Sequence, residues 1–303
     1  MTMKLAVPDF VSPSYFPAVA AVELGFFKAE GLDVEFQHLF PIDAAYRALR
    51  EGTADFVGGS AHAALSAFPE WEGVKLLCAQ AQGMYWSLVM RADLGAARGD
   101  LNCVKGRRIG AAPWVDMGLR ALLEDAGIDI ERDKVSIAPV PGARGPGVNF
   151  GLMAAQRLHE GQIDGFWANG MAAEVAVRSG AGTVVIDARR GDGPKTAFGF
   201  TFSAVAASDR LLQEVPGVGA AAQRAIARVH AALREQPERA AGVGRKIFPP
   251  AEAGLIAELV RRDTPYYDPV ITPARVSSLN AFARRMGILQ GDPLHAQVVW
   301  TGT

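Results

Sequence analysis

Apolar and polar positions along the first forty residues follow two different periods. Residues 3–7 are mostly apolar, as in a buried strand, and residues 16–25 have the pattern of a short amphipathic helix. Gly25 and Gly31 then mark turns, because glycine adopts positive φ without steric cost. Residues 33–37 alternate between polar and apolar side chains, which is the period of a half-buried strand. This order predicts two parallel strands joined by a crossover helix.

Strand and helix patterns continue to alternate up to about residue 205, and helices follow one another after that. The predicted strands are residues 3–7, 33–38, 55–58, 74–80, 86–91, 107–111, 135–140, 163–167, 182–187 and 198–207. The predicted helices are residues 16–25, 42–51, 60–68, 116–126, 148–160, 170–179, 216–235, 237–247, 250–262 and 272–287. Alternation of this kind favours an α/β protein with mainly parallel sheets.

Two glycine-containing segments divide the chain into two predicted lobes. Residues 91–106 are expected to cross from the first lobe to the second, and residues 190–199 are expected to return. Lobe one is then residues 1–92 plus 200–303, and lobe two is residues 93–199. A chain of 303 residues is long enough to bury a large core in one or two domains.

The segment ELGFFKAEGLDV, Glu23 to Val34, carries a family resemblance. It resembles the opening of type II periplasmic binding proteins, in the branch that binds sulfonates, nitrate or taurine, and thiamine pyrimidines for ABC transporters. Further matches extend over nearly the whole chain: ALREGTADFVGG (48–59), VKGRRIG (104–110), LHEGQIDG (158–165) and ARRMGI (283–288). The resemblance implies the fold of that family, with two α/β lobes and a ligand cleft between them.

Charge and cysteine content limit the kinds of partner and cofactor that the sequence predicts. The 31 lysine and arginine residues nearly balance the 32 aspartate and glutamate residues, so no strong field attracts nucleic acid. Cys78 and Cys103 lack the spacing of metal ligands and form no disulfide framework, and Cys78 is interpreted as a core residue. The sequence therefore predicts no nucleic-acid partner, no metal and no cofactor.

The beginning of the chain and its longest apolar runs bear on its location. MTMKLAVPDF lacks the basic and apolar regions of a signal peptide, so the sequence as written predicts a cytoplasmic protein, and a trimmed sequence would predict a periplasmic one. No run of about 18 apolar residues predicts a membrane span.

Two segments that follow predicted strands of lobe one supply candidate ligand contacts, since open α/β sheets bind ligands at the carboxyl ends of their strands. In DFVSPSYF, Phe10 and Tyr15 offer aromatic faces beside the hydroxyl group of Ser12. In GGSAHA, Ser60 is expected to open a helix whose free N–H groups suit an anion. Ser60 is either the helix N-cap or a ligand contact, and His62 is either packed or part of the site.

Lobe two supplies candidates of the same kind. In AAPWVDMG, Trp114 offers a ring for stacking on a planar ligand, and Asp116 either caps the following helix or accepts a hydrogen bond from the ligand. Trp167 and Asn169 end another predicted strand with a large ring and an amide.

Three further residues complete the predicted ligand-binding set. Arg144, in the loop PGARGPGVN, either pairs with a ligand carboxylate or is a solvated loop residue. Trp86 and Phe200 add apolar surface near the predicted lobe crossings. With so many rings among the candidates, the sequence favours an aromatic or heterocyclic ligand over a small inorganic anion.

The resemblance implies a substrate-binding protein for a small organic ligand such as an aromatic acid, a sulfonate or a pyrimidine, with an ABC permease as partner. The chain has no G-x-S-x-G, H-E-x-x-H or Cys-x-x-Cys motif, which favours a binding protein over an enzyme. The alternative is a cytoplasmic decarboxylase, desulfinase or thiamine-pyrimidine synthase, because the chain also resembles enzymes on this fold. Ser12 falls near the position of the desulfinase cysteine and is a poorer nucleophile, and His62 falls near a histidine of the pyrimidine synthase.

Overall fold

The computed structural model describes residues 2–143 and 148–302. These residues form two compact units: unit 1 is Met1–Gln82 with Gly199–Thr303, and unit 2 is Gly83–Phe198. The first boundary falls before the predicted crossing at residue 92, because the strand Ser87–Arg91 pairs inside unit 2. Arg144, a predicted ligand contact, lies outside the described residues.

Unit 1 contains a five-stranded sheet in the order β2-β1-β3-β10-β4. Its strands are β1 (Met3–Val7), β2 (Val34–His38), β3 (Phe56–Ser60), β4 (Val74–Ala81) and β10 (Ser203–Ser208). Its helices are α1 (Phe16–Glu23), α2 (Phe26–Ala29), α3 (Ile42–Glu51), α7 (Asp209–Glu214), α8 (Val218–Glu235), α9 (Arg239–Ile247), α10 (Pro250–Asp263), α11 (Pro273–Arg285) and α12 (His295–Val298). Three 3₁₀ helices, η1 (Ala61–Ser66), η2 (Pro69–Trp71) and η7 (Thr264–Tyr266), connect these elements.

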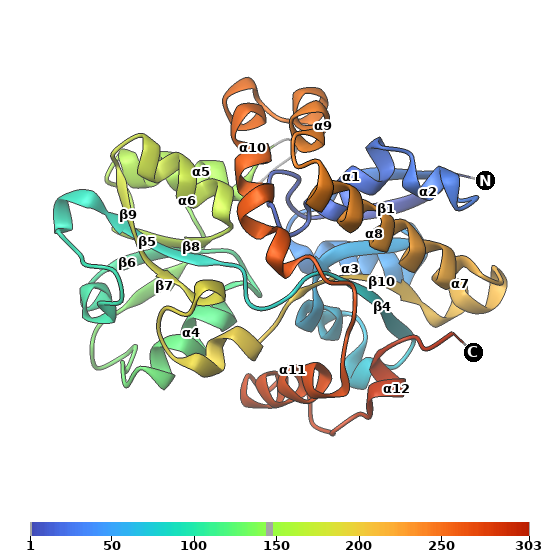
Figure 1. Ribbon diagram of the computed structural model, residues 1–303. Helices are drawn as coiled ribbons and strands as arrows, with labels where there is room; N and C mark the ends of the chain where they lie inside the picture. The colour runs from blue at the N-terminus through green and yellow to red at the C-terminus, as the bar shows by residue number, and fades with distance from the viewer. Residues whose placement is uncertain (1, 144–147, 303) are drawn as a thin grey trace. The chain divides into compact units, whose positions relative to one another are not determined.

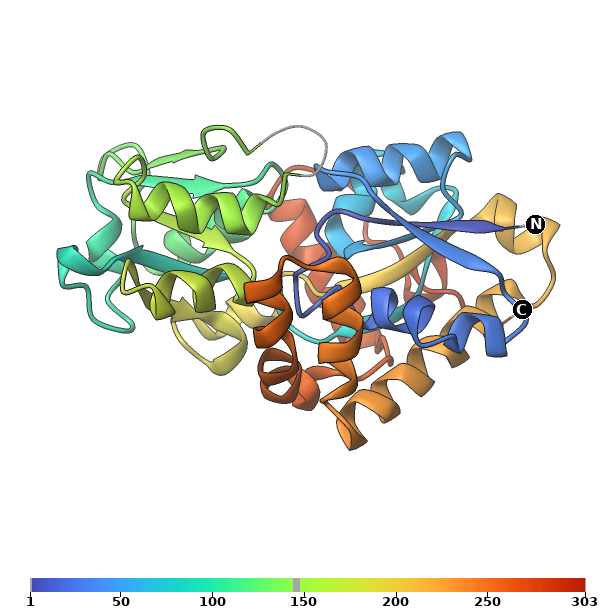
Figure 2. The same cartoon turned by 90° about the horizontal axis from the view of Figure 1, so that it is seen from above.

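Helices cover both faces of this sheet, as Figure 2 shows, with α3 on one face and α1, α2 and α8 on the other. In Figure 1 the long helix α8 runs beside α1 and α2. The buried side chains Leu5, Phe56 and Leu76 come from three strands of the sheet and form part of the core. Burial on both faces explains why these strands read as nearly continuous apolar runs in the sequence.

Unit 2 contains a second five-stranded sheet in the order β7-β6-β8-β5-β9. Its strands are β5 (Ser87–Arg91), β6 (Arg108–Ala111), β7 (Ser136–Ala138), β8 (Gly165–Ala168) and β9 (Gly182–Asp187). Its α-helices are α4 (Asp116–Asp125), α5 (Phe150–His159) and α6 (Gly170–Arg178). Its 3₁₀ helices are η3 (Ala92–Leu94), η4 (Leu101–Val104), η5 (Ala188–Arg190) and η6 (Lys195–Gly199), the last ending at the boundary with unit 1. Figure 1 shows α5 and α6 on one face of this sheet and α4 on the other.

Each sheet contains one reversed strand, so the sheets are mixed. β10 is antiparallel to both β3 and β4, and β5 is antiparallel to both β8 and β9. The other ladders, β1 with β2 and β3, and β6 with β7 and β8, are parallel as expected. Each reversed strand is the first strand after the chain passes from one unit to the other, where no crossover helix precedes it.

None of the described helices combines the length and the apolar character needed to cross a lipid bilayer.

Candidate functional site

The carboxyl ends of β1 and β3 meet at one edge of the unit 1 sheet. Leu5 of β1 pairs with Phe56 of β3 in a parallel ladder, so both strands finish on the same side. The loop after β1 contains Ser12, and Ser60 is the last residue of β3. We call this part of the molecule the unit 1 edge. It brings together the two lobe-one segments that the sequence indicated.

The loop after β1 is fixed by residues from distant parts of unit 1. The hydroxyl of Tyr267 donates to the carbonyl oxygen of Pro13 at 2.6 Å. At the start of α1, the N–H of Ala18 donates to Oε1 of Gln80 at 3.2 Å. The side-chain amide of Gln80 also donates to the backbone of β10. The loop is therefore held by buried hydrogen bonds and is not a surface turn.

A buried histidine supports this arrangement. Nε2 of His230, on α8, lies 2.8 Å from the carbonyl oxygen of Gln80, so this nitrogen carries the proton and donates it. The imidazole stacks on Tyr267 with ring centroids 5.4 Å apart. Burial lowers the pKa of His230 from 6.5 to about 4, because the charged form would lose its hydration. His230 is therefore neutral at physiological pH and acts as a fixed hydrogen-bond donor.

Two serine hydroxyl groups at the unit 1 edge are buried without a hydrogen-bond partner. Ser12 and Ser60 have no exposed surface, and no described residue bonds to either Oγ atom. The predicted α-helix after Ser60 is instead the 3₁₀ helix η1, whose first N–H, that of Ala61, donates to the carbonyl oxygen of Phe202 at 2.9 Å. The expected free N-terminal N–H is therefore already used. Ser60 makes no side-chain cap, so its interpretation as an N-cap is wrong.

His62 and Phe200 lie against a residue that sequence reasoning missed, Phe282 of α11. The His62 ring meets Phe282 edge-on at 5.5 Å, and its Nδ1 atom lies 2.9 Å from Oγ1 of Thr201. Phe200 stacks on Phe282 at 5.0 Å, with the guanidinium of Arg285 over its ring. His62 is fully buried, so the structure favours the packed interpretation of this residue.

The two aromatic candidates in the loop after β1 have structural roles of their own. Phe10 packs edge-on against Phe36 of β2 at 5.0 Å and lies 5.2 Å from the ring of His38. Tyr15 is buried and is the residue directly before α1. Phe10 therefore joins its loop to the neighbouring strand β2.

In unit 2, the corresponding edge is formed by the carboxyl ends of β6, β8 and β9 and the start of β5. Trp167 of β8 pairs with Ala111 of β6 and with Leu88 of β5. Ser87 of β5 pairs with Asp187 of β9. These registers bring the ends of four strands to one side of the sheet, which we call the unit 2 edge.

A row of aromatic rings lies along the unit 2 edge. The Trp167 and Trp86 ring centroids are 6.3 Å apart, and those of Trp86 and Tyr85 are 4.7 Å apart. The guanidinium of Arg189 lies 5.4 Å from the Tyr85 ring centroid and donates to the carbonyl oxygen of Gly83. All four side chains are buried, and Nε1 of Trp167 has no hydrogen-bond partner among the described residues. We call this set the aromatic row.

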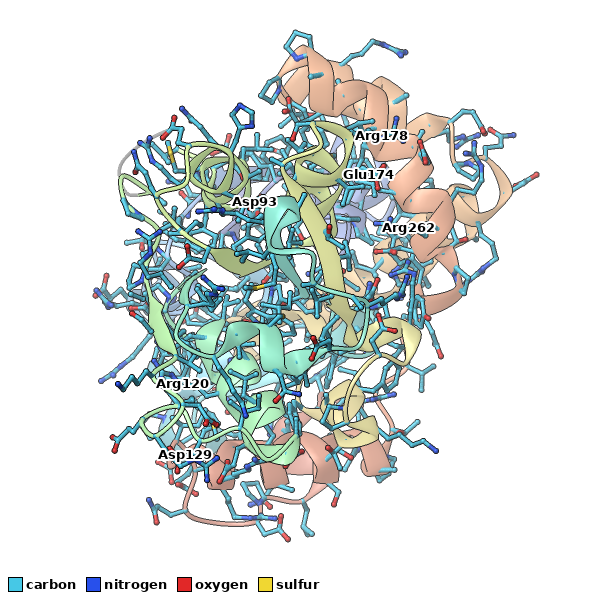
Figure 3. The ribbon with its side chains drawn as sticks, turned by 90° about the vertical axis from the view of Figure 1, so that its left-hand side faces the viewer. Asp93, Arg120, Asp129, Glu174, Arg178 and Arg262 are labelled. Carbon is cyan, nitrogen blue, oxygen red and sulfur yellow. The ribbon has the colours of Figure 1, made fainter. Side chains whose placement is uncertain are left out.

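The turn between β6 and α4 holds Trp114 and Asp116. Trp114 adopts φ of +70°, a conformation that costs a tryptophan about 1–2 kcal/mol and that is common at functional turns. Asp116 is the first residue of α4 and does not cap it; its carboxylate pairs with Arg120 at 2.8 Å. Arg120 is labelled in Figure 3.

Asn169, a predicted ligand contact, caps a helix. Its Oδ1 accepts hydrogen bonds from the N–H groups of Met171 and Ala172 at the start of α6. Its amide nitrogen lies close to Gly151 of α5, where a Cβ atom would come within 2.8 Å of it. Asn169 therefore fixes the start of α6 beside α5.

The described residues contain no group of three or more histidine, cysteine, aspartate or glutamate side chains placed to hold a metal ion. Cys78 is buried in β4, as predicted, and burial raises the pKa of its thiol to about 12. A thiol with this pKa stays protonated at neutral pH and is a weak nucleophile.

Besides Phe282, sequence reasoning missed four residues that support these edges: Gln80, Tyr85, Arg189 and His230. Gln80 left a signal, because it is a polar residue within the apolar run of β4. His230 left another, because it lies on the apolar face of α8 near Ile226 and Leu233. Buried polar residues of this kind usually have specific hydrogen-bond partners.

The two mixed sheets, each covered by helices on both faces, define the type II periplasmic-binding-protein fold, which is also the fold of solved solute-binding proteins. Residues 12–240 match the model of the family described as "NMT1/THI5 like", and the chain belongs to this family. The search of curated proteins returned no match.

Three solved structures illustrate the likeness of fold. The alkanesulfonate-binding protein SsuA from Xanthomonas axonopodis pv. citri, bound to MOPS, is 13% identical with a TM-score of 0.73, covering 99% of this chain and 98% of that one. A putative sulfonate ABC transporter periplasmic binding protein, SsuA from Methylobacillus flagellatus KT, is 16% identical with a TM-score of 0.68, covering 99% and 91%. A mutant of DSZB in complex with biphenyl-2-sulfinic acid is 15% identical with a TM-score of 0.65, covering 98% and 96%.

Proposed function

We propose that this protein is the solute-binding component of an ABC import system, which binds a small organic molecule and releases it unchanged. In this role it works with a permease on the outer side of the cytoplasmic membrane. The family and the likeness to two SsuA proteins support the proposal. Each unit offers its own proposed place of ligand contact, the unit 1 edge or the unit 2 edge, because ligands of open α/β sheets bind at strand carboxyl ends.

One observation carries the proposal more than any other. Buried polar atoms in folded proteins nearly always have a hydrogen-bond partner, and each exception needs an explanation. Oγ of Ser60 at the end of β3 and Nε1 of Trp167 near the end of β8 are two such exceptions, and Oγ of Ser12 in the loop after β1 is a third. Ligand groups at the unit 1 edge account for the two serine hydroxyls, and ligand groups at the unit 2 edge account for the Trp167 indole.

An enzyme that uses a serine nucleophile has less support. A serine hydroxyl attacks a substrate only when a neighbouring base removes its proton. Within the described parts of the chain, neither Ser12 nor Ser60 bonds through Oγ to such a base. A binding protein, in contrast, needs only the hydroxyl as a hydrogen-bond donor and acceptor.

Equilibrium dialysis tests the proposal directly. The purified protein is dialysed against a mixture of aromatic carboxylates, alkane and arene sulfonates, and pyrimidines, and both chambers are analysed by mass spectrometry. We expect at least one compound to be enriched with the protein at unchanged mass. A new product mass that depends on the protein would refute the proposal.

Two serine variants test whether the enriched compound binds at the unit 1 edge. Ser60→Ala should weaken the binding of the enriched compound, because it removes a hydroxyl group at the unit 1 edge. Ser208→Ala is the matched control, since Ser208 caps α7 at the opposite end of the unit 1 sheet. Equal binding by both variants and the wild type would remove the unit 1 edge from the binding site.

A further inference from the structure

The indole of Trp167 places a chemical requirement on whatever binds at the unit 2 edge. An indole N–H donates a hydrogen bond and cannot accept one. Trp167 has no exposed surface, and its Nε1 atom bonds to no described residue. The matching group must therefore be an acceptor such as a carboxylate, a sulfonate or a carbonyl oxygen. A ligand group that carries only donors leaves this requirement unmet.

The residues around Trp167 narrow the class of ligand further. The rings of the aromatic row pack next to it, and a flat apolar body stacks favourably on aromatic rings. At the other end of the row, the buried guanidinium of Arg189 lies over the Tyr85 ring. A hydrogen bond from an N–H to an ionised acceptor is about twice as strong as one to a neutral acceptor, which favours an acidic ligand group.

The turn that carries Trp114 gives a second, independent indication. β6 ends at Ala111, which pairs with Trp167, so this turn begins beside the end of β8. The φ of +70° at Trp114 costs energy, and such conformations cluster at functional sites. The strained residue and the indole without a partner thus belong to neighbouring strand ends of the same unit.

We infer that the unit 2 edge recognises an aromatic acid, whose acidic group accepts a hydrogen bond from Nε1 of Trp167 while its ring packs against the aromatic row. This inference rests on the proposed function and specifies its ligand class. It assigns Trp167 as the residue that selects for the acidic group.

Three probes separate the parts of this inference. Benzoate has both the ring and the acceptor, benzylammonium has the ring with donors only, and cyclohexanecarboxylate has the acceptor without an aromatic ring. Binding to the full-length protein is measured by isothermal titration calorimetry. We expect benzoate to bind more tightly than either of the other probes. Absence of benzoate binding, or binding of benzylammonium that is as tight, would overturn the inference.

Variants and spectroscopy identify the residue. Trp167→Phe keeps a ring and removes the N–H, and it should weaken benzoate binding by about tenfold or more. Trp300→Phe is the matched control, because Trp300 lies near the end of the chain in unit 1 and should bind benzoate as the wild type does.

In the ¹⁵N-labelled wild type, we expect the indole signal of Trp167 to shift downfield when benzoate binds, a readout that does not depend on the folding of a variant. Benzoate binding without this shift, or unchanged affinity in Trp167→Phe, would overturn the assignment.

The outcomes also distinguish this inference from the proposed function. If the dialysis enriches only non-aromatic solutes at unchanged mass, the proposed function stands and the inference fails. If an aromatic acid is converted to a product and Trp167→Phe raises the KM for it, the inference stands and the proposed function fails.

Discussion

Replacing Ser60 by alanine should make the ligand-free protein more stable. The Ser60 hydroxyl is fully buried without a partner, and burying such a group costs about 1–3 kcal/mol. Alanine removes the polar atom and leaves the rest of the residue in place. We expect the free energy of unfolding to rise by about 1 kcal/mol, the lower end of that range, because the removed oxygen also leaves a small void.

The control is the same substitution at a serine that has a partner. Oγ of Ser208 accepts a hydrogen bond from the N–H of Leu211 at 3.2 Å and caps α7. Ser208→Ala should therefore lower the free energy of unfolding by about 1 kcal/mol. The two variants should move the midpoint of thermal unfolding in opposite directions, each by about 2–4 °C for a domain of this size.

The assay is thermal and urea unfolding of the ligand-free protein, followed by circular dichroism. A loss of stability in Ser60→Ala as large as that in Ser208→Ala would mean that the hydroxyl has a partner in the native protein. The reasoning about strand-end contacts would then fail for this residue. A gain in stability together with weaker ligand binding would show that the Ser60 hydroxyl lowers the stability of the free protein and is kept because it binds the ligand.

Three other substitutions test the framework around the edges. Because the pKa of His230 is lowered in the folded protein, the unfolded chain binds a proton at a higher pH than the folded one. The free energy of unfolding of the wild type should therefore fall by about 3 kcal/mol between pH 6.5 and 4. In urea titrations over this range, the free energy of unfolding of His230→Gln should fall by less. Tyr267→Phe leaves the carbonyl of Pro13 without its donor and should cost about 1–2 kcal/mol in urea unfolding; an unchanged midpoint would contradict this. Gly165→Ala should lower the free energy of unfolding by about 1–3 kcal/mol, because the added Cβ would lie 2.9 Å from a backbone oxygen. The control Gly254→Ala, in open space on α10, should leave this free energy unchanged or raise it. Similar urea midpoints for the two variants would refute the packing argument.

Most helices and strands could be predicted from the sequence because their apolar periods are regular. The helix at 42–51 and the strands at 3–7 and 182–187 have the predicted bounds. The predicted strand at 198–207 was less accurate: its first residues belong to η6, and β10 begins at Ser203. Periodicity also gives no strand direction, so the reversal of β5 and β10 could not be predicted.

The strand ends that form the two edges could be predicted from the sequence, and the hydrogen-bond partners of their side chains could not. Strand-end position selected Ser60 and Trp167, and Ser12 lies in the loop after β1; each has a buried side-chain polar atom without a partner among the described residues. Whether a buried hydroxyl has a partner depends on residues far away in sequence. Asn169 shows the limit, since a cap and a ligand contact look the same in a linear pattern.

The position of β10 in the sequence determines the order in which the two units become complete during translation. All five strands of unit 2 have been synthesised by Asp187, and the backbone of Met84 bonds to that of Phe198, which joins the two ends of the unit. The unit 1 sheet remains in two pieces at that point, because β10 is the strand that connects β3 to β4. Unit 2 can therefore fold on the ribosome before the unit 1 sheet is complete. The joined ends of unit 2 then bring the two separated parts of unit 1 together.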